Sequence, residues 1–87
     1  MAKLIFLDEP PTGDNLTDYD RQHAGLYLRL LDAEAQRANW HDVVKVIFQI
    51  DPAKDFARAK RVYANHLDRA HWVAASGHRD LLPKKNL

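Results

Sequence analysis

Cysteine is absent from this 87-residue chain, which excludes disulfides, zinc sites built on thiolates and cysteine nucleophiles. Glycine and proline are scarce, at three and four residues. No apolar run approaches the ~20 residues that a membrane-spanning helix needs. The N-terminal apolar block is only Leu4–Leu7, which is too short for a signal peptide, so we expect a cytoplasmic protein with no membrane contact.

The composition is that of one small globular domain. Hydrophobic residues make up 46% of the chain and charged residues 29%, and a chain of this length is too short for a second domain. No repeat or low-complexity tract divides it.

The net charge is only +1, but it is unevenly distributed. Residues 8–42 hold eight acids and three bases, whereas residues 43–87 hold nine bases and four acids. A DNA-binding domain usually carries a clear basic excess, because neutralised phosphates supply most of its affinity. Two interpretations stay open: a mixed solvated surface, or an acidic first half that repels DNA and attracts a protein.

The first predicted helix begins at Thr17, where Thr17 and Asp20 have the spacing of a capping box. It ends near Ala33–Ala35, and Gly25 within it costs about 1 kcal/mol unless a neighbour packs closely there. The predicted core-facing residues are Tyr19, His23, Leu26, Tyr27, Leu30 and Leu31.

The second predicted element follows the cap residue Asn39. The β-branched content of residues 43–50 favours a strand, whereas the cap and the spacing of the apolar residues favour a buried helix. We predict a helix that ends before Asp51-Pro52, because a residue that precedes proline avoids the α region.

The third and longest predicted helix begins after Asp55 and ends at Gly77. Its apolar residues follow a 3.6-residue period, which predicts a core-facing stripe. That stripe consists of Phe56, Ala59, Val62, Tyr63, His66, Leu67, Ala70, Val73 and Ala74.

These elements predict an all-α fold of three helices, in the outline of a helix-turn-helix with an extended turn from Gln49 to Asp55. The folded domain covers residues 17–82. An N-terminal arm of residues 1–16 precedes it, within which Leu4–Leu7 forms either a short strand or an extended segment. Residues 83–87 form a frayed tail, and we expect Leu81 and Leu82 to fold back over the open end of the core.

One outward stripe of the third helix carries the candidate DNA-binding residues. They are Arg58, Lys60, Arg61, Asn65 and Arg69. Arginine and asparagine suit base edges and phosphates, although arginine stems that cover apolar surface explain the same stripe. Trp72 is expected to pack under an arginine or against Leu81 and Leu82.

Large apolar residues that three helices leave partly uncovered would mark a protein interface. The candidate partner-binding residues are Tyr27, Leu28, Trp40, Phe48 and Trp72.

Catalytic and metal-binding signatures are weak. Ser76 is the single serine and has no obvious base beside it, and no glycine-rich phosphate loop occurs. Of the five histidines, His66 and His71 are five residues apart and do not share a helix face, while His23 and His66 fit hydrogen-bonded core positions. We therefore expect no enzyme activity, metal, cofactor or small-molecule ligand.

Three stretches in combination resemble a known family. They are Tyr19–His23 leading to Leu26–Ala33, Trp40–Val43 leading to Ile50–Pro52, and Ala57–Arg61 leading to His66–Trp72, closed by Gly77–Leu82. Together they resemble the RovC-like DNA-binding domain family of proteobacteria, over residues 17–82.

The resemblance implies a helix-turn-helix variant with an extended turn. It also implies that one face of the domain binds DNA, while another docks onto the N-terminal domain of a transcriptional activator that controls transfer of integrative and conjugative elements. Because few residues precede the matched region, the chain resembles the stand-alone, QseM-type version.

That version is an antiactivator linked to quorum sensing. It occupies the activator's partner domain and blocks transcription, and its own DNA binding is weak or absent. The basic stripe of the third helix keeps open the alternative of a DNA-binding transcriptional regulator that uses that helix.

Overall fold

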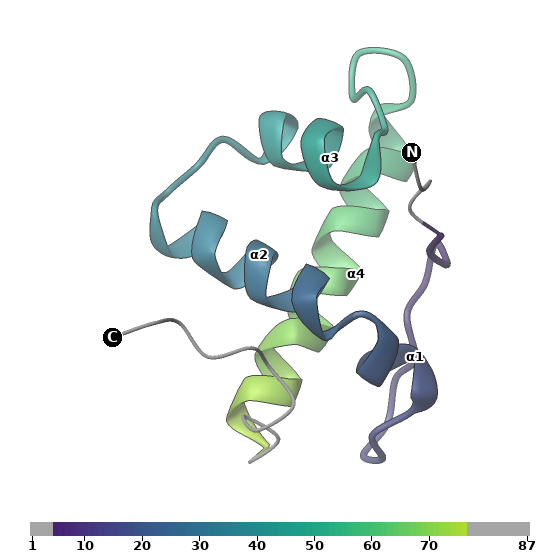
Figure 1. Ribbon diagram of the computed structural model, residues 1–87. Coiled ribbons are helices and arrows are strands. Elements are labelled where there is room, and N and C mark those ends of the chain that lie inside the picture. The colour runs from purple at the N-terminus through teal and green to yellow at the C-terminus, as the bar shows by residue number, and fades with distance from the viewer. Residues whose placement is uncertain (1–4, 77–87) are drawn as a thin grey trace.

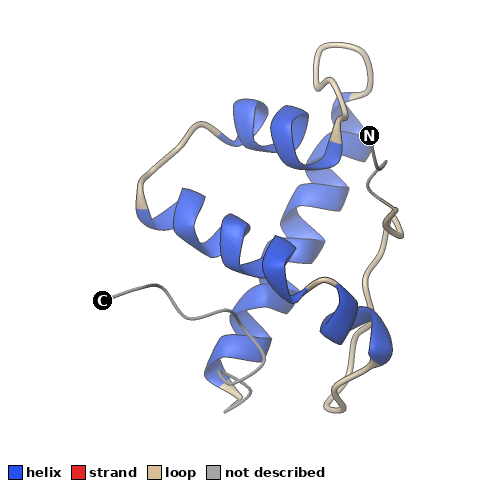
Figure 2. Ribbon diagram, in the orientation of Figure 1, coloured by secondary structure: helices blue, strands red, loops and turns tan. Residues whose placement is uncertain are grey.

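The computed structural model describes residues 5–76, and this part of the chain is helical with no strand (Figures 1 and 2). The helices are α1 (Asp18–Gln22), α2 (Ala24–Ala35), α3 (Trp40–Phe48) and α4 (Phe56–Ala75). The predicted all-α class is confirmed, and the arrangement is compatible with the helix-turn-helix outline. The predicted stop at Gly77, the leucines Leu81 and Leu82, and the tail 83–87 lie outside the described residues.

The predicted first helix is two helices, because the chain departs from helical geometry at His23, where φ is −111° and ψ is 18°. The predicted start is confirmed: the Thr17 side chain accepts from the Asp20 N–H, and the Asp20 carboxylate accepts from the Thr17 N–H. At the break, His23 uses its ring as well as its backbone. Its Nδ1 lies 2.8 Å from the Tyr19 carbonyl oxygen, and its N–H is shared between the carbonyls of Tyr19 and Asp20. No atom lies within 4 Å of a Cβ added at Gly25, so no neighbour packs closely there.

α3 settles the ambiguity between strand and helix in favour of the helix. Asn39 caps it by accepting from the N–H of His41 at 2.8 Å, as predicted. The helix ends at Phe48, and Gln49 adopts the left-handed conformation with φ 59°, which reverses the chain before the predicted boundary at Pro52.

α4 is the longest helix and supports the others: both α2 and α3 pack against it (Figure 1). Asp55 occupies the predicted N-cap position, but its side chain makes no capping hydrogen bond. The predicted apolar stripe faces the core along most of its length, with Ala59, Val62 and Val73 fully buried. Phe56 is the exception. It lies in the first turn of α4 and is 52% exposed.

The core is formed where α2, α3 and α4 meet. Its buried apolar members are Leu26, Tyr27, Leu30, Val43, Val44, Ile47, Phe48, Ile50, Ala59, Val62, Ala70 and Val73.

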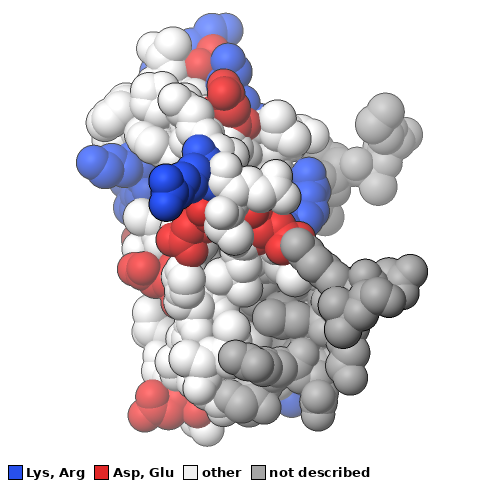
Figure 3. All heavy atoms as spheres, turned by 90° about the vertical axis from the view of Figure 1, so that its left-hand side faces the viewer, with Lys and Arg blue, Asp and Glu red and all other residues white. Residues whose placement is uncertain are grey.

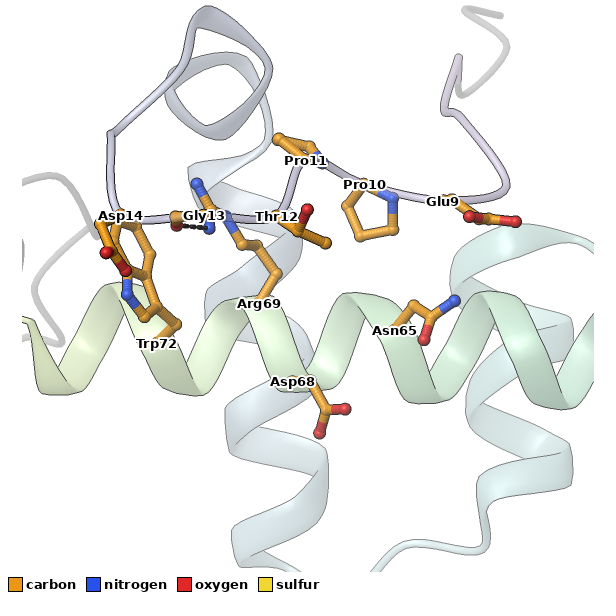
Figure 4. A pocket seen from close by; sticks show the side chains of 10 residues that line it. All are labelled: Glu9, Pro10, Pro11, Thr12, Gly13, Asp14, Asn65, Asp68, Arg69 and Trp72. Atoms are coloured by element: carbon orange, nitrogen blue, oxygen red, sulfur yellow. Dashed lines mark hydrogen bonds between the residues drawn. The ribbon is translucent and has the colours of Figure 1, made fainter.

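Residues 5–17 form an extended arm rather than a strand. Phe6 of the arm packs edge-on against Phe48, with ring centroids 5.0 Å apart. The arm passes along α4 in the same direction as the helix, since Asp8 meets Arg58 and Gly13 meets Arg69 (Figure 4). The described part of the predicted arm is therefore packed against the domain.

Candidate binding faces of α3 and α4

The arm covers the part of the predicted basic stripe of α4 that contains Asn65 and Arg69. Figure 4 shows residues 9–14 passing over α4, with Arg69 rising from the helix towards them. Between arm and helix lies a cavity of about 380 Å3. Its lining residues are Glu9, Pro10, Pro11, Thr12, Gly13, Asp14, Asn65, Asp68, Arg69 and Trp72. The arm thus stands where a DNA duplex would have to approach this side of α4.

Arg69 is a buried structural residue, so its prediction as a DNA contact is wrong. Its side chain is 4% exposed. The guanidinium donates to both oxygens of Asp20, at 3.0 and 2.8 Å, and to the carbonyls of Gly13 and Asn15, at 2.8 and 2.9 Å. It also lies 3.9 Å above the ring of Trp72, which confirms the prediction that this tryptophan packs under an arginine. A guanidinium engaged in this way cannot also contact DNA.

Asp20 is the acceptor at the centre of this network. Besides Arg69, it accepts from the Tyr27 hydroxyl at 2.7 Å and from the backbone N–H of Thr17 at 2.9 Å. Burial by itself would raise the pKa of Asp20, but the hydrogen bonds from Arg69, Thr17 and Tyr27 outweigh burial and hold that pKa well below its usual range. The carboxylate is therefore charged at neutral pH and offsets the charge of Arg69.

Arg58 and Arg61 also face a carboxylate, but at the surface. Arg58 donates through Nε and Nη2 to the two oxygens of Asp8, both at 2.9 Å. Arg61 Nη2 lies 3.7 Å from Asp8 Oδ2. The hydrogen bonds that Arg58 donates to Asp8 lower the pKa of Asp8 and raise the pKa of Arg58. These two arginines are half-exposed, in contrast to Arg69.

The remaining two candidates of the stripe differ from each other. Asn65 lines the cavity under the arm. Lys60 is exposed on another side of α4, where its Nζ lies 5.9 Å from the centroid of the Phe56 ring. The structure therefore does not bring the five predicted DNA-binding residues onto one accessible face.

Two of the predicted partner-binding residues are core residues, which corrects that prediction. Tyr27 is 0% exposed and Phe48 is 2% exposed. Both lie on the sides of their helices that pack against neighbouring elements. Leu28 of α2, Trp40 of α3 and Trp72 of α4 are partly exposed, so only these three of the five can contribute to a protein interface.

Trp40 belongs instead to a surface cluster that spacing alone did not assemble. Its ring centroid lies 5.6 Å from that of Phe56 and 5.7 Å from that of Tyr63, and the His41 ring lies 6.2 Å from that of Phe56. We call Trp40, His41, Phe56 and Tyr63 the aromatic face. Phe56 was missed because its helical spacing placed it on the core stripe. Its position directly after the cap, ahead of the packed turns, was the signal against burial.

A second concave surface lies between α2 and α3, with a volume of about 400 Å3. It is lined by Arg29, Ala33, Gln36, Ala38, Asp42, Val43, Val46 and Ile47, and Val46 is 68% exposed.

Acidic and basic side chains are interspersed on the face seen in Figure 3, which is the left-hand side of the view in Figure 1. On that face the described residues form no continuous basic surface for nucleic acid.

The histidines at core positions are hydrogen-bonded. His66 is fully buried. Its Nδ1 lies 2.8 Å from the Val62 carbonyl and must carry the proton, because a carbonyl can only accept. Its Nε2 then accepts from the Tyr19 hydroxyl at 2.6 Å, and that hydroxyl accepts from the Leu7 N–H at 3.1 Å. Burial lowers the pKa of His66, so the imidazole is neutral in the folded protein.

Within residues 5–76, no cluster of three or more histidine and acidic side chains has the arrangement of a metal site. In the same range, no helix combines the length and apolarity needed to cross a membrane.

Neither a scan against protein-family models nor a search of curated proteins finds a match to this chain. The resemblance to the RovC-like family therefore stays a prediction.

Proposed function

We propose that this chain is a protein-binding antiactivator. In this proposal it binds the N-terminal partner domain of a transcriptional activator and blocks activation of the transfer of an integrative and conjugative element, in a circuit linked to quorum sensing. The supporting observation is the engagement of the α4 arginines by the chain's own carboxylates. Arg69 is buried against Asp20, and Arg58 and Arg61 face Asp8. Contacts between basic side chains and phosphates supply most of the affinity for DNA. Because the arginines of α4 already pair with carboxylates, we expect α4 to bind a DNA duplex weakly.

The aromatic face is the proposed docking surface. Protein interfaces depend on a few large anchors, among which tryptophan, tyrosine and arginine are enriched. Trp40 and Tyr63 are half-buried, so their rings are already held in place, and Phe56 is 52% exposed beside them. Covering these rings would remove apolar surface from water without first ordering flexible side chains.

The mechanism is competition. The chain occupies the surface through which the activator's two domains contact each other, and it contributes no DNA contact of its own, so the resulting complex is inactive. The alternative function, a DNA-binding regulator that uses α4, is favoured by the exposed Lys60 and the half-exposed Arg58 and Arg61.

A binding assay with two probes separates these functions. The first probe is the purified N-terminal domain of an activator of an integrative and conjugative element from the same genome. The second is a DNA duplex that carries the activator's operator, tested at low salt. We expect the chain to bind the protein domain and to leave the duplex unshifted. Tight DNA binding that falls steeply with salt, without binding to the protein domain, would overturn the proposal.

Matched variants test the docking surface. Phe56→Ala removes an exposed anchor of the aromatic face, and we expect it to weaken binding to the activator domain about tenfold, as loss of a hot-spot residue does. Val46→Ala removes an apolar side chain of similar exposure from the groove between α2 and α3, and binding should be unchanged. The reverse pattern would assign docking to that groove instead.

A further inference from the structure

Two arginines of α4 converge on one carboxylate of the arm. Arg58 contacts both oxygens of Asp8 through a two-pronged hydrogen bond, with both distances at 2.9 Å, and Arg61 approaches the same carboxylate to 3.7 Å. This fork geometry is the one in which arginine binds phosphate as well as carboxylate oxygens. Arg58 and Arg61 thus form a site for an oxyanion, and the Asp8 carboxylate of the same chain fills it.

Asp8 is held far more weakly than Asp20, the carboxylate of α1 that pairs with Arg69. The side chains of Asp8, Arg58 and Arg61 are 40%, 40% and 45% exposed. Ion pairs this exposed are screened by water and salt, and they contribute little to stability. Arg69 and Asp20, by contrast, are 4% and 0% exposed, so the same helix carries one displaceable arginine pair and one arginine that cannot be freed without unfolding.

The arm has two parts, residues 5–8 and residues 10–17, which are held differently. Pro10 is buried, and the carbonyls of Gly13 and Asn15 accept from Arg69, so the second part is anchored. The first part is held through its backbone, since the Leu7 N–H donates to the Tyr19 hydroxyl and the Ile5 carbonyl contacts the His23 ring. The Asp8 side chain, by contrast, is 40% exposed. The Asp8 side chain can therefore rotate into water while the anchored part stays in place.

We propose that Arg58 and Arg61 form a binding site for a phosphate of a nucleic-acid backbone, and that Asp8 occupies this site as an internal competitor. The negative charge of Asp55 also acts on Arg58 and raises the pKa of that arginine. The arm then has a function beyond packing, because the Asp8 carboxylate decides whether Arg58 and Arg61 can bind nucleic acid. This inference concerns a different surface from the aromatic face.

The test compares two neutralised acids in the full chain. Asp8→Asn removes the competitor, whereas Asp18→Asn removes an acid of the same charge that pairs with Arg21 elsewhere on the surface. Binding of a short fluorescein-labelled DNA duplex is followed by anisotropy at several salt concentrations. We expect Asp8→Asn to bind about fivefold more tightly than Asp18→Asn at low salt, the factor that release of one exposed ion pair allows. The affinity of Asp8→Asn should also fall more steeply with salt concentration, because it gains about one to two phosphate contacts and each contact steepens that dependence.

A triple variant, Asp8→Asn with Arg58→Ala and Arg61→Ala, should lose the whole gain. Equal affinity of Asp8→Asn and Asp18→Asn would overturn the proposal, and so would a gain that survives removal of both arginines. Polyglutamate serves as a second labelled probe, and equal tightening towards it would overturn the assignment to nucleic acid. Circular dichroism checks that each variant is folded. Because the activator domain is absent from this assay, its outcome is independent of the proposed antiactivator function.

Discussion

Arg69 and Asp20 are 49 positions apart in the sequence and share two hydrogen bonds, of 3.0 and 2.8 Å, in the interior of the protein. The same carboxylate caps α1 through Thr17 and accepts from Tyr27 of α2, while the same guanidinium holds the arm through Gly13. One ion pair therefore connects the arm, α1, α2 and α4. We therefore expect its loss to destabilise the whole domain.

Replacing Arg69 by methionine tests this. Arg69→Met keeps much of the side-chain volume but leaves the buried Asp20 carboxylate without its partner, so we expect the free energy of unfolding to fall by about 3–5 kcal/mol. Urea denaturation followed by circular dichroism measures the change. Asp18→Asn breaks an exposed pair with Arg21 and should change stability by less than about 1 kcal/mol. Equal stability of Arg69→Met and the unmodified chain would show that the pair is not structural.

His66 predicts a pH dependence of stability. Burial lowers the pKa of His66 in the folded state below the usual histidine value of about 6.5. The unfolded chain therefore binds the proton more readily. The neutral imidazole's contribution is fully present above about pH 6.5 and is lost as the pH falls towards the folded-state pKa. The loss is at most about 1.4 kcal/mol per pH unit.

The measurement is the free energy of unfolding at about pH 7.5 and about pH 5.5, for the unmodified chain and for His66→Gln. Glutamine keeps a polar side chain but does not titrate, so the variant should lose less stability between these two pH values. If the unmodified chain and His66→Gln lose the same stability between these pH values, groups other than His66 cause the pH dependence.

Two glycines predict opposite responses to the same substitution. Gly25 lies in α2 with nothing within 4 Å of an added Cβ, so Gly25→Ala should stabilise the protein by about 0.4–1 kcal/mol by restricting the unfolded chain. Gly13 has φ +96°, which an L-residue rarely adopts, so Gly13→Ala should be destabilising despite the open space around it. Thermal denaturation of both variants checks the contrast. Stabilisation by both would mean that the turn at Gly13 relaxes without cost.

The helix starts could be predicted because their signals are local. Thr17 and Asn39 bond to N–H groups two or three residues away, and that spacing is visible in the sequence. The break at His23 was missed, because it involves a ring that reaches the Tyr19 carbonyl on one side and the Ile5 carbonyl of the arm on the other. Tyr27 was predicted both to face the core and to contact a partner, and the structure decides for the core. Its hydroxyl needs Asp20, and only packing shows that this partner is present.

Sequence alone determined the helical class, most of the helix boundaries and the apolar stripe of α4, because side-chain periodicity and capping act over a few residues. Only the tertiary structure decided what the arginines of α4 do. A helical period places Arg58, Arg61 and Arg69 on one side of the helix, and it would do so equally for a free basic face. Whether that side meets water, DNA or the chain's own carboxylates depends on the path of the N-terminal arm, which brings Asp8 to Arg58 across 50 positions. That path results from long-range burial and charge pairing, and the local pattern contains no information about it.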